Sequence, residues 1–204
     1  KMINGPINKS KTLKKKYLGV TEYVAKNFKQ KKFAMLIYNK ELSVCPVTTH
    51  LPLKSVSKKI TRKLIKEKIE IVNDFFKKFL NFKPKIGVVG LNPHCESILK
   101  YNEDTKIISP VIDSMKKKIS VKGPLPADTI FLKNNRKKFD VIIGMYHDQV
   151  LTPIKTLFEY DAINITIGLP FLRVTPDHGP NETMVGKNQS NPTSLIKAFS
   201  FLDK

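Results

Sequence analysis

The chain has 204 residues, 41% of them hydrophobic, and its 37 lysines and arginines against 17 aspartates and glutamates give a formal net charge of +20. This length and composition predict a globular protein with a substantial core, in one large domain or two small ones. No apolar run approaches the roughly 20 residues of a membrane span, and residues 1–16 lack the apolar stretch of a signal peptide. We therefore expect no membrane partner and a cytoplasmic location.

The positive charge raises the question of nucleic-acid binding, because lysines and arginines that neutralise phosphates drive such binding. Base readout depends on arginine, yet the chain has only Arg62, Arg136 and Arg173. The lysines are scattered in small groups, and no nucleic-acid motif is present. Nucleic acid is therefore not the expected partner, whereas a small anionic substrate would be attracted by the charge.

The first half of the chain predicts a hairpin, a long helix and a strand. Two strand-like runs over 33–38 and 43–48 are close enough in sequence to favour a hairpin. Apolar residues at helical spacing predict an amphipathic helix over 57–82. An apolar run over 86–91 predicts the next strand.

The second half alternates helix and strand. An amphipathic helix is predicted over 104–118, where terminal lysines suit the helix dipole, and a rigid, proline-punctuated loop over 123–129. A strand over 140–145 follows, and Asn191 is a favourable N-cap for a closing helix. This alternation favours an α/β fold, in which crossover helices connect the strands of a sheet.

Titratable residues directly follow two β-branched runs, 141–145 and 162–169, which should be buried. In open α/β sheets, ligands bind just beyond the carboxyl ends of strands. The segment 144–181 therefore reads as an active site.

Three histidines share one context: His50, His94 and His147 each lie just past an apolar, strand-like run. Three imidazoles at one sheet edge would suit Zn²⁺ or a similar divalent ion and would leave a position open for substrate. Their sequence spacing matches no local metal motif, so a structural role for each histidine remains an alternative. Asp128 and Asp148 are candidates for supporting the ligands or for acid/base catalysis.

A second polar cluster consists of Lys155, Asn164 and Arg173, which lie in a segment otherwise rich in apolar residues. Such a cluster indicates a site for one anion, and the arginine could hold a phosphate through two hydrogen bonds. For Lys155, an ordinary surface position remains the alternative.

Motifs along nearly the whole chain carry a more specific resemblance: GPINK (5–9), TTHLPL (48–53), GLNPH (90–94), GPLPADT (123–129), YHDQ (146–149) and NITIGLPFLR (164–173). In this order they closely resemble the bacterial 4-hydroxythreonine-4-phosphate dehydrogenase family of vitamin B6 synthesis. The resemblance implies an α/β/α fold like that of isocitrate and isopropylmalate dehydrogenases. It implies a split outer, nucleotide-side domain (1–22 and 160–204) and an inner dimerisation and metal-binding domain (23–159).

The resemblance also implies residue roles. The family binds one divalent ion (Zn, Mg or Co) through three histidines contributed across a homodimer interface, and these match His50, His94 and His147. Its substrate contacts match Thr21, Lys155, Asn164 and Arg173. The stretch 177–192 is similar to a nucleotide-binding loop of related dehydrogenases, which makes His178, Gly179 and Asn191 candidates for binding NAD or NADP.

The implied reaction is the NAD-dependent oxidation of 4-phosphooxy-L-threonine in pyridoxal phosphate biosynthesis. The product is a β-keto acid, which decarboxylates to 3-amino-2-oxopropyl phosphate. Lys155 and Asp128 are the implied catalytic residues, with proton transfer assigned to Asp128.

Two departures from the family pattern leave alternatives open. Val20 stands where the family usually has a substrate-contacting histidine, and a region that family members carry before GPINK is absent. One alternative is a paralogue that acts on another phosphorylated hydroxy acid. The other is a binder of phosphate ligands or nucleic acid that has lost catalysis.

Overall fold

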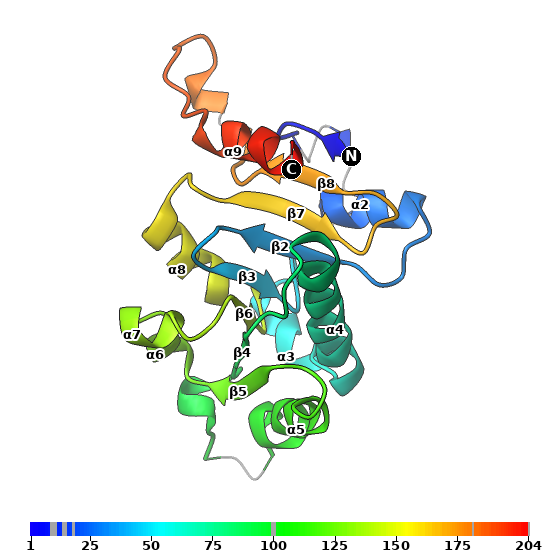
Figure 1. Ribbon diagram of the computed structural model, residues 1–204, viewed down its shortest axis with the longest axis vertical. Coiled ribbons are helices and arrows are strands. Elements are labelled where there is room, and N and C mark those ends of the chain that lie inside the picture. The colour runs from blue at the N-terminus through cyan, green and yellow to red at the C-terminus, as the bar shows by residue number, and fades with distance from the viewer. Residues whose placement is uncertain (9–11, 14–15, 18, 99–100, 181, 204) are drawn as a thin grey trace.

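The computed structural model describes residues 1–8, 12–13, 16–17, 19–98, 101–180 and 182–203. Strands of this part of the chain form one eight-stranded sheet. They are β1 (Met2–Ile3), β2 (Ala34–Tyr38), β3 (Ser43–Pro46), β4 (Ile86–Val89), β5 (Val121–Leu125), β6 (Val141–Gly144), β7 (Ile163–Ile167) and β8 (Arg173–Pro176). Their order across the sheet is β1-β8-β7-β2-β3-β6-β4-β5, so the sheet extends along the whole molecule (Figure 1).

Helices connect the strands and cover the sheet. They are α2 (Val20–Asn27), α3 (Val56–Lys59), α4 (Arg62–Phe79), α5 (Ser109–Met115), α6 (Ala127–Ile130), α7 (Lys133–Arg136), α8 (His147–Phe158) and α9 (Thr193–Leu202). Single turns of 3₁₀-helix lie at Leu53–Ser55, Pro93–Cys95 and Glu182–Met184.

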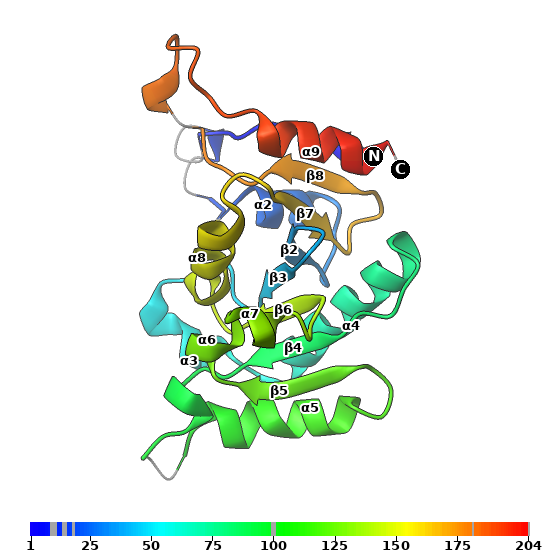
Figure 2. The same ribbon diagram turned by 60° about the vertical axis from the view of Figure 1, so that its left-hand side comes forward.

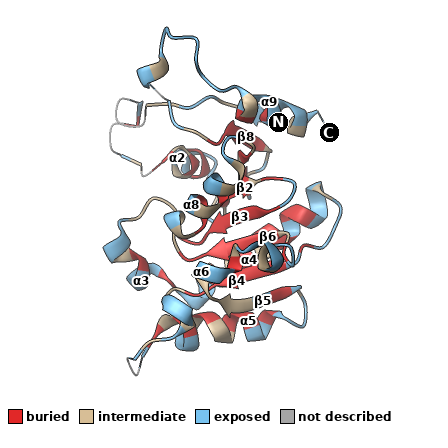
Figure 3. Cartoon of the chain, turned by 90° about the vertical axis from the view of Figure 1, so that its left-hand side faces the viewer, coloured by how far each residue is buried: buried red, intermediate tan, exposed pale blue. Residues whose placement is uncertain are grey.

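The two faces of the sheet carry separate apolar clusters, because successive side chains of a strand point to opposite faces. Leu36 and Ile143 belong to the larger cluster, which includes residues of α4, α5 and α9. Ile37 and Ile142, their neighbours in sequence, belong to a second cluster with residues of α6 and α8. Figures 1 and 2 show α4 and α5 on one side of the sheet and α6 and α8 on the other. Strands β3, β4 and β6 between them are buried (Figure 3).

Four neighbouring strands, β3, β6, β4 and β5, are all parallel. Their carboxyl ends therefore meet at one edge of the sheet. On the other side of this block, β2 pairs antiparallel with both β3 and β7. The predicted hairpin and the predicted crossover connections are thus confirmed.

The single helix predicted over 57–82 is wrong, because the chain breaks into α3 and α4. Ile60 is extended, with φ −69° and ψ 116°. Thr61 is the N-cap of α4, and its hydroxyl accepts a hydrogen bond from the backbone N–H of Leu64 at 3.2 Å. Threonine caps a helix in this way because it satisfies an otherwise unpaired N–H group. The apolar periodicity continues across the break and so conceals it.

The rigid loop predicted over 123–129 is also wrong. Its first residues belong to β5, and residues from Ala127 onward form α6. Strand β5 pairs with β4 and lies at the edge of the sheet, where a proline is tolerated because its missing N–H can face away from the ladder. The helix predicted over 104–118 comprises a π-helix, Asp104–Ile108, followed by α5.

The closing helix begins two residues after its predicted cap. Asn191 accepts a hydrogen bond from the backbone N–H of Thr193 at 2.9 Å, although Pro192 occupies the cap position of α9. The asparagine therefore satisfies a helix N–H group, as expected of a capping residue.

The division into 1–22 with 160–204 and 23–159 stays a prediction. Strands from both parts belong to one sheet, since β2 pairs with β7 over five residues, from Ala34↔Ile167 to Tyr38↔Ile163. None of the helices that the structure describes is long and apolar enough to cross a membrane.

Candidate active site

The three histidines follow β3, β4 and β6, which are neighbours in the sheet. The rings of His50 and His147 have centres 5.7 Å apart, and both line one cavity. His94 lines a different cavity, together with Asp128. Among the described residues, no group of three histidine, cysteine, aspartate or glutamate side chains is placed to hold a metal ion. One chain therefore brings together two of the three predicted ligands.

Carboxylates contact both histidines of the pair. Glu22 Oε1 lies 3.4 Å from His50 Nδ1 and accepts a hydrogen bond from the Thr49 hydroxyl at 2.6 Å. Burial raises the pKa of Glu22, but the hydrogen bonds from His50 and Thr49 outweigh this and lower it to about 2. Asp148 Oδ1 lies 2.6 Å from His147 Nδ1. A carboxylate on one ring nitrogen orients the imidazole so that the other nitrogen can bind an ion.

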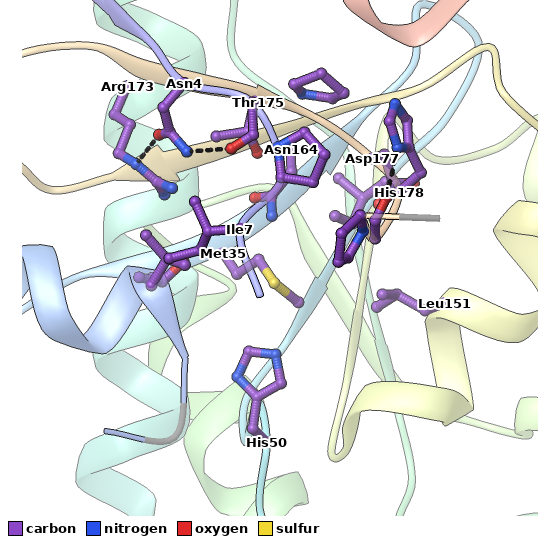
Figure 4. Close-up of a pocket in the computed structure, with 18 of the residues that line it drawn as sticks. Asn4, Ile7, Met35, His50, Leu151, Asn164, Arg173, Thr175, Asp177 and His178 are labelled. Atoms are coloured by element: carbon purple, nitrogen blue, oxygen red, sulfur yellow. Dashed lines mark hydrogen bonds between the residues drawn. The ribbon is translucent and has the colours of Figure 1, made fainter. Parts of the chain in front are cut away.

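The cavity beside this pair has a volume of about 240 Å³ and receives residues from distant parts of the chain (Figure 4). It combines apolar side chains such as Met35 and Leu151 with polar groups at the ends of β7 and β8. Predicted residues that line it are Thr21, His50, His147, Lys155, Asn164, Arg173, His178 and Gly179. A pocket of this kind suits a small polar ligand.

Arg173 is 2% exposed. Its Nε donates to Asn4 Oδ1 at 2.9 Å and its Nη1 to Thr166 Oγ1 at 2.6 Å. Within the described part of the chain, no carboxylate forms an ion pair with it. Burial lowers the pKa of its guanidinium to about 10, which the charge of Glu22 opposes. The group remains cationic at neutral pH and is held rigidly at the cavity, which suits the binding of an anion.

Two further predicted substrate residues flank the arginine. Asn164 Oδ1 is buried and has no hydrogen-bond partner among the described residues, so a ligand donor could satisfy it. The hydroxyl of Thr21 lies 3.5 Å from that of Thr166, to which Arg173 donates. Val20, at the start of α2, also lines the cavity. It contributes no polar group there.

Lys155 projects from α8 and is held by the segment after β8. Its Nζ lies 2.9 Å from Asp177 Oδ2 and 2.5 Å from the backbone carbonyl of the same residue. The side chain of Lys155 is 43% exposed, and its ammonium group is nevertheless held at the cavity wall by Asp177. Burial raises the pKa of Asp177, and the lysine opposes this shift.

The predicted cofactor residues are divided. His178 and Gly179 line the cavity, whereas Asn191 is exposed and accepts a hydrogen bond from the first residue of α9. Of the motif GPINK, Lys9 lies outside the described residues, while Gly5, Pro6 and Ile7 line the cavity.

Asp128 and His94 share the second cavity, which has a volume of about 320 Å³. The carboxylate of Asp128 is exposed there and does not line the cavity of the His50 and His147 pair. His94 and the following Cys95 both have left-handed backbone angles, φ 56° and 62°. Asp104, which is completely buried, supports this loop by accepting backbone hydrogen bonds.

Four residues of the site had no clear signal in the sequence: Asn4, Glu22, Thr166 and Asp177. Asn4 and Thr166 contact Arg173 only in the folded chain. Glu22 and Asp177 are neighbours of predicted residues in the sequence, but a single acidic side chain is too common to indicate a site. Asp177 was the most accessible to inference, because it follows an apolar strand as the histidines do.

Comparison with known proteins identifies the family of the chain. A family model described as "Pyridoxal phosphate biosynthetic protein PdxA" matches residues 1–202. The chain is 43% identical over 185 residues to the 4-hydroxythreonine-4-phosphate dehydrogenase of Sulfurihydrogenibium sp. (strain YO3AOP1), which covers 89% of this chain and 57% of that protein. It is 38% identical over 181 residues to the D-threonate 4-phosphate dehydrogenase of Pectobacterium atrosepticum, covering 88% and 56%. The chain thus spans little more than half the length of these relatives.

Solved structures support the fold. The 4-hydroxythreonine-4-phosphate dehydrogenase of Klebsiella pneumoniae superposes with a TM-score of 0.81 at 32% identity, covering 98% of this chain and 63% of that one. The isocitrate dehydrogenase of Methylococcus capsulatus has a TM-score of 0.60 at 16% identity, covering 98% and 67%, and bears on the fold alone. The expected α/β/α fold is confirmed. The chain belongs to the family of the pyridoxal phosphate biosynthetic protein PdxA.

Proposed function

We propose that this chain carries the metal and substrate sites of a metal-dependent, NAD(P)-dependent oxidoreductase. In this proposal the substrate is 4-phosphooxy-L-threonine, and the β-keto acid product decarboxylates to 3-amino-2-oxopropyl phosphate, in pyridoxal phosphate biosynthesis. One observation carries the proposal: the pair His50 and His147 lines the same cavity as the cations Lys155 and Arg173. A ligand with a chelating group at one end and a phosphate at the other would satisfy both ends.

The spacing of the two histidines fits a shared ion. Two imidazoles that bind one Zn²⁺ at the usual bond length have ring centres roughly 5 Å apart, close to the 5.7 Å between His50 and His147. A third ligand is needed for a site that still leaves a position for substrate. We propose that His94 of the partner subunit supplies it in a homodimer, with Zn, Mg or Co as the ion.

In such a dimer, the residues beside His94 would also belong to the shared site. His94 and Asp128 line the second cavity together, so the subunit that contributes the histidine would also contribute this carboxylate. An exposed aspartate can transfer a proton if it reaches the substrate. Asp128 is proposed for that step.

The chain's own residues would bind and orient the substrate. Arg173 and Lys155 would hold the phosphate, and Asn164 Oδ1, buried without a partner among the described residues, would accept a hydrogen bond from the substrate. Thr21 would complete this end of the cavity. Fixing both ends of a small substrate places its reacting carbon without further loss of entropy.

When bound, the metal ion would supply Lewis acidity and NAD or NADP would accept a hydride. His178 and Gly179 are proposed to face this cofactor, since both line the cavity. Asn191 is retained as a weaker candidate, since it lies outside the cavity lining. A cytoplasmic location stays a prediction from the sequence.

The alternatives from the sequence are less well supported. A protein that only binds phosphate or nucleic acid would not need two adjacent histidines beside its anion site. A paralogue with another phosphorylated substrate remains of interest because of Val20 in the cavity and the D-threonate 4-phosphate dehydrogenase relative. Assays of NADH formation with 4-phosphooxy-L-threonine and with D-threonate 4-phosphate would decide between these substrates.

A complementation experiment tests the shared metal site. Binding of Co²⁺ would be followed by its visible absorption in the unmodified chain and in the variants His147→Ala and His94→Ala. We expect either substitution to abolish binding, and a dissociated and reassociated mixture of the two variants to recover part of it. Recovery follows because a mixed dimer contains one site with all three histidines.

The variant His178→Ala is the matched control, because this histidine lines the cavity but lies outside the proposed ligand set. It should retain Co²⁺ binding. Full metal occupancy in His147→Ala, or no recovery in the mixture although mixed dimers form, would contradict the proposal.

A further inference from the structure

Strands β4 and β6 stop pairing just before the loops that carry His94 and His147. The last paired residues are Val88 and Ile143. Among the residues that the structure describes, β4 and β6 form no ladder pair beyond these two residues. The spacing of the two histidine-bearing loops must therefore be set by other groups.

The side chain of Gln149 lies between these two loops. Its Nε2 donates to the backbone carbonyl of Gly90 at 2.7 Å, and its Oε1 accepts from the backbone N–H of Met145 at 2.7 Å. Gly90 begins the loop to His94, and Met145 begins the loop to His147. The side-chain amide of Gln149 thus connects β4 and β6 by hydrogen bonds just beyond the point where their backbone pairing ends.

The local sequence makes room for this amide. A Cβ atom on Gly144 would lie 3.1 Å from Gln149 Oε1 and 2.4 Å from Val150 Cγ1. The second distance is shorter than non-bonded carbon atoms tolerate. Glycine at the end of β6 therefore allows α8 to start close enough for Gln149 to reach back to the strand ends.

Two further hydrogen bonds extend this connection to the neighbouring segments on both sides. The hydroxyl of Thr48, two residues before His50, donates to the carbonyl of Met145 at 2.8 Å. On the far side, the buried carboxylate of Asp104 accepts from the N–H of Leu91 at 2.7 Å. A connected series of bonds thus links all three histidine-bearing segments.

We infer that Gln149 is a positioning residue, which fixes the loops carrying His94 and His147 at the strand ends and thereby places His147 in the metal site of its own subunit and His94 in the site shared with the partner subunit. This inference rests on the proposed metal site. Glutamine suits the role because its amide offers a donor and an acceptor at the end of one side chain. Methionine has a similar length and shape but offers neither group to the backbone.

The test compares Gln149→Met with the unmodified chain in three measurements: affinity for Co²⁺, affinity for inorganic phosphate, and amide hydrogen exchange. We expect Co²⁺ to bind about 10-fold or more weakly, as is usual when a group that orients metal ligands is lost. Phosphate affinity should stay unchanged, because Gln149 is not among the residues that line the cavity of Lys155 and Arg173. The amide of Met145 should exchange roughly 5- to 10-fold faster.

Gln30, in the segment after α2, offers a matched control, since Gln30→Met makes the same chemical change at a residue that lines neither cavity. It should alter none of the three measurements. If Gln149→Met does not fold, Gln149→Asn keeps the amide but shortens the arm, so it cannot reach both loops and should weaken Co²⁺ binding in the same way.

The outcomes separate this inference from the proposed function. Unchanged Co²⁺ affinity in Gln149→Met, with tight binding to the unmodified chain, would overturn the inference alone. Equal losses of Co²⁺ and phosphate affinity would also overturn it, because they would report a general structural defect. Failure of the unmodified chain to bind Co²⁺ would overturn the proposed function and, with it, the role of Gln149 in metal geometry.

Discussion

Lys155 on α8 and Asp177 after β8 form an ion pair at the wall of the candidate active site, with Nζ 2.9 Å from Oδ2. The carboxylate is 8% exposed, whereas 43% of the lysine side chain is exposed. The buried carboxylate of Asp177 thus holds the ammonium group of Lys155 at the cavity. This ammonium group is oriented before any ligand binds, but its charge is partly neutralised.

Replacing Asp177 with asparagine should strengthen phosphate binding. The substitution keeps the size of the side chain and the backbone carbonyl that contacts Lys155, but it removes the neutralising charge. Only the lysine of this pair is exposed, and solvent screening limits such ion pairs to about 0.2–1 kcal/mol, so we expect an increase in phosphate affinity of a few-fold by calorimetry. Asp161→Asn, which removes the partner of Lys197 away from the cavity, serves as the control. Weaker phosphate binding in Asp177→Asn would show that orientation by the carboxylate matters more than its charge.

Arg173→Lys should weaken phosphate binding and lower stability. Lysine cannot present two hydrogen bonds in one plane and cannot donate to Asn4 and Thr166 in the geometry of the guanidinium. Each buried polar partner left without a hydrogen bond costs about 1–3 kcal/mol. We expect a loss of this order in urea unfolding and at least a tenfold loss of phosphate affinity. The exposed Arg62 provides the control, since Arg62→Lys should change neither property by a comparable amount.

Asp104→Asn should destabilise the protein and loosen the loop to His94. Its two carboxylate oxygens accept from the N–H of Leu91 at 2.7 Å, from the N–H of Asn92 at 3.1 Å and from the side-chain amide of Asn92 at 2.7 Å. An asparagine amide would place a donor against these donors. Hydrogen bonds to a charged acceptor are worth about 1.5–3 kcal/mol, and urea unfolding should show a loss of this size. Asp113 is exposed, so Asp113→Asn serves as the control. Equal losses of unfolding free energy at both positions would contradict the role of the buried carboxylate.

The alternation of strand and helix was readable from the sequence because apolar periodicity reports local structure. The hairpin of β2 and β3 and the placement of His50, His94 and His147 after strands were predicted correctly. The errors arose where periodicity conceals a local feature. Thr61 interrupts the long helix through a hydrogen bond of its side chain, and the apolar pattern on either side does not register that bond.

The candidate site was predictable in its residue types but only partly in its geometry. Asn164 and Arg173 lie on β7 and β8, where the antiparallel register pairs Thr166 with Arg173. Their joint presence at the cavity follows from this pairing. The contact between Asn4 and Arg173 spans 169 positions of the chain, and no local pattern could indicate it.

The amino-acid sequence by itself determined the α/β class, the family resemblance, and the set of candidate side chains for a metal ion or phosphate, because these depend on local periodicity and on motifs. Tertiary structure alone decided which of these side chains meet. His50 and His147 share a cavity because β3 and β6 are neighbours in the sheet, while His94 and Asp128 line another. Strand order arises from the burial of both faces of the sheet by helices that are distant in sequence, and that is a property of the whole folded chain.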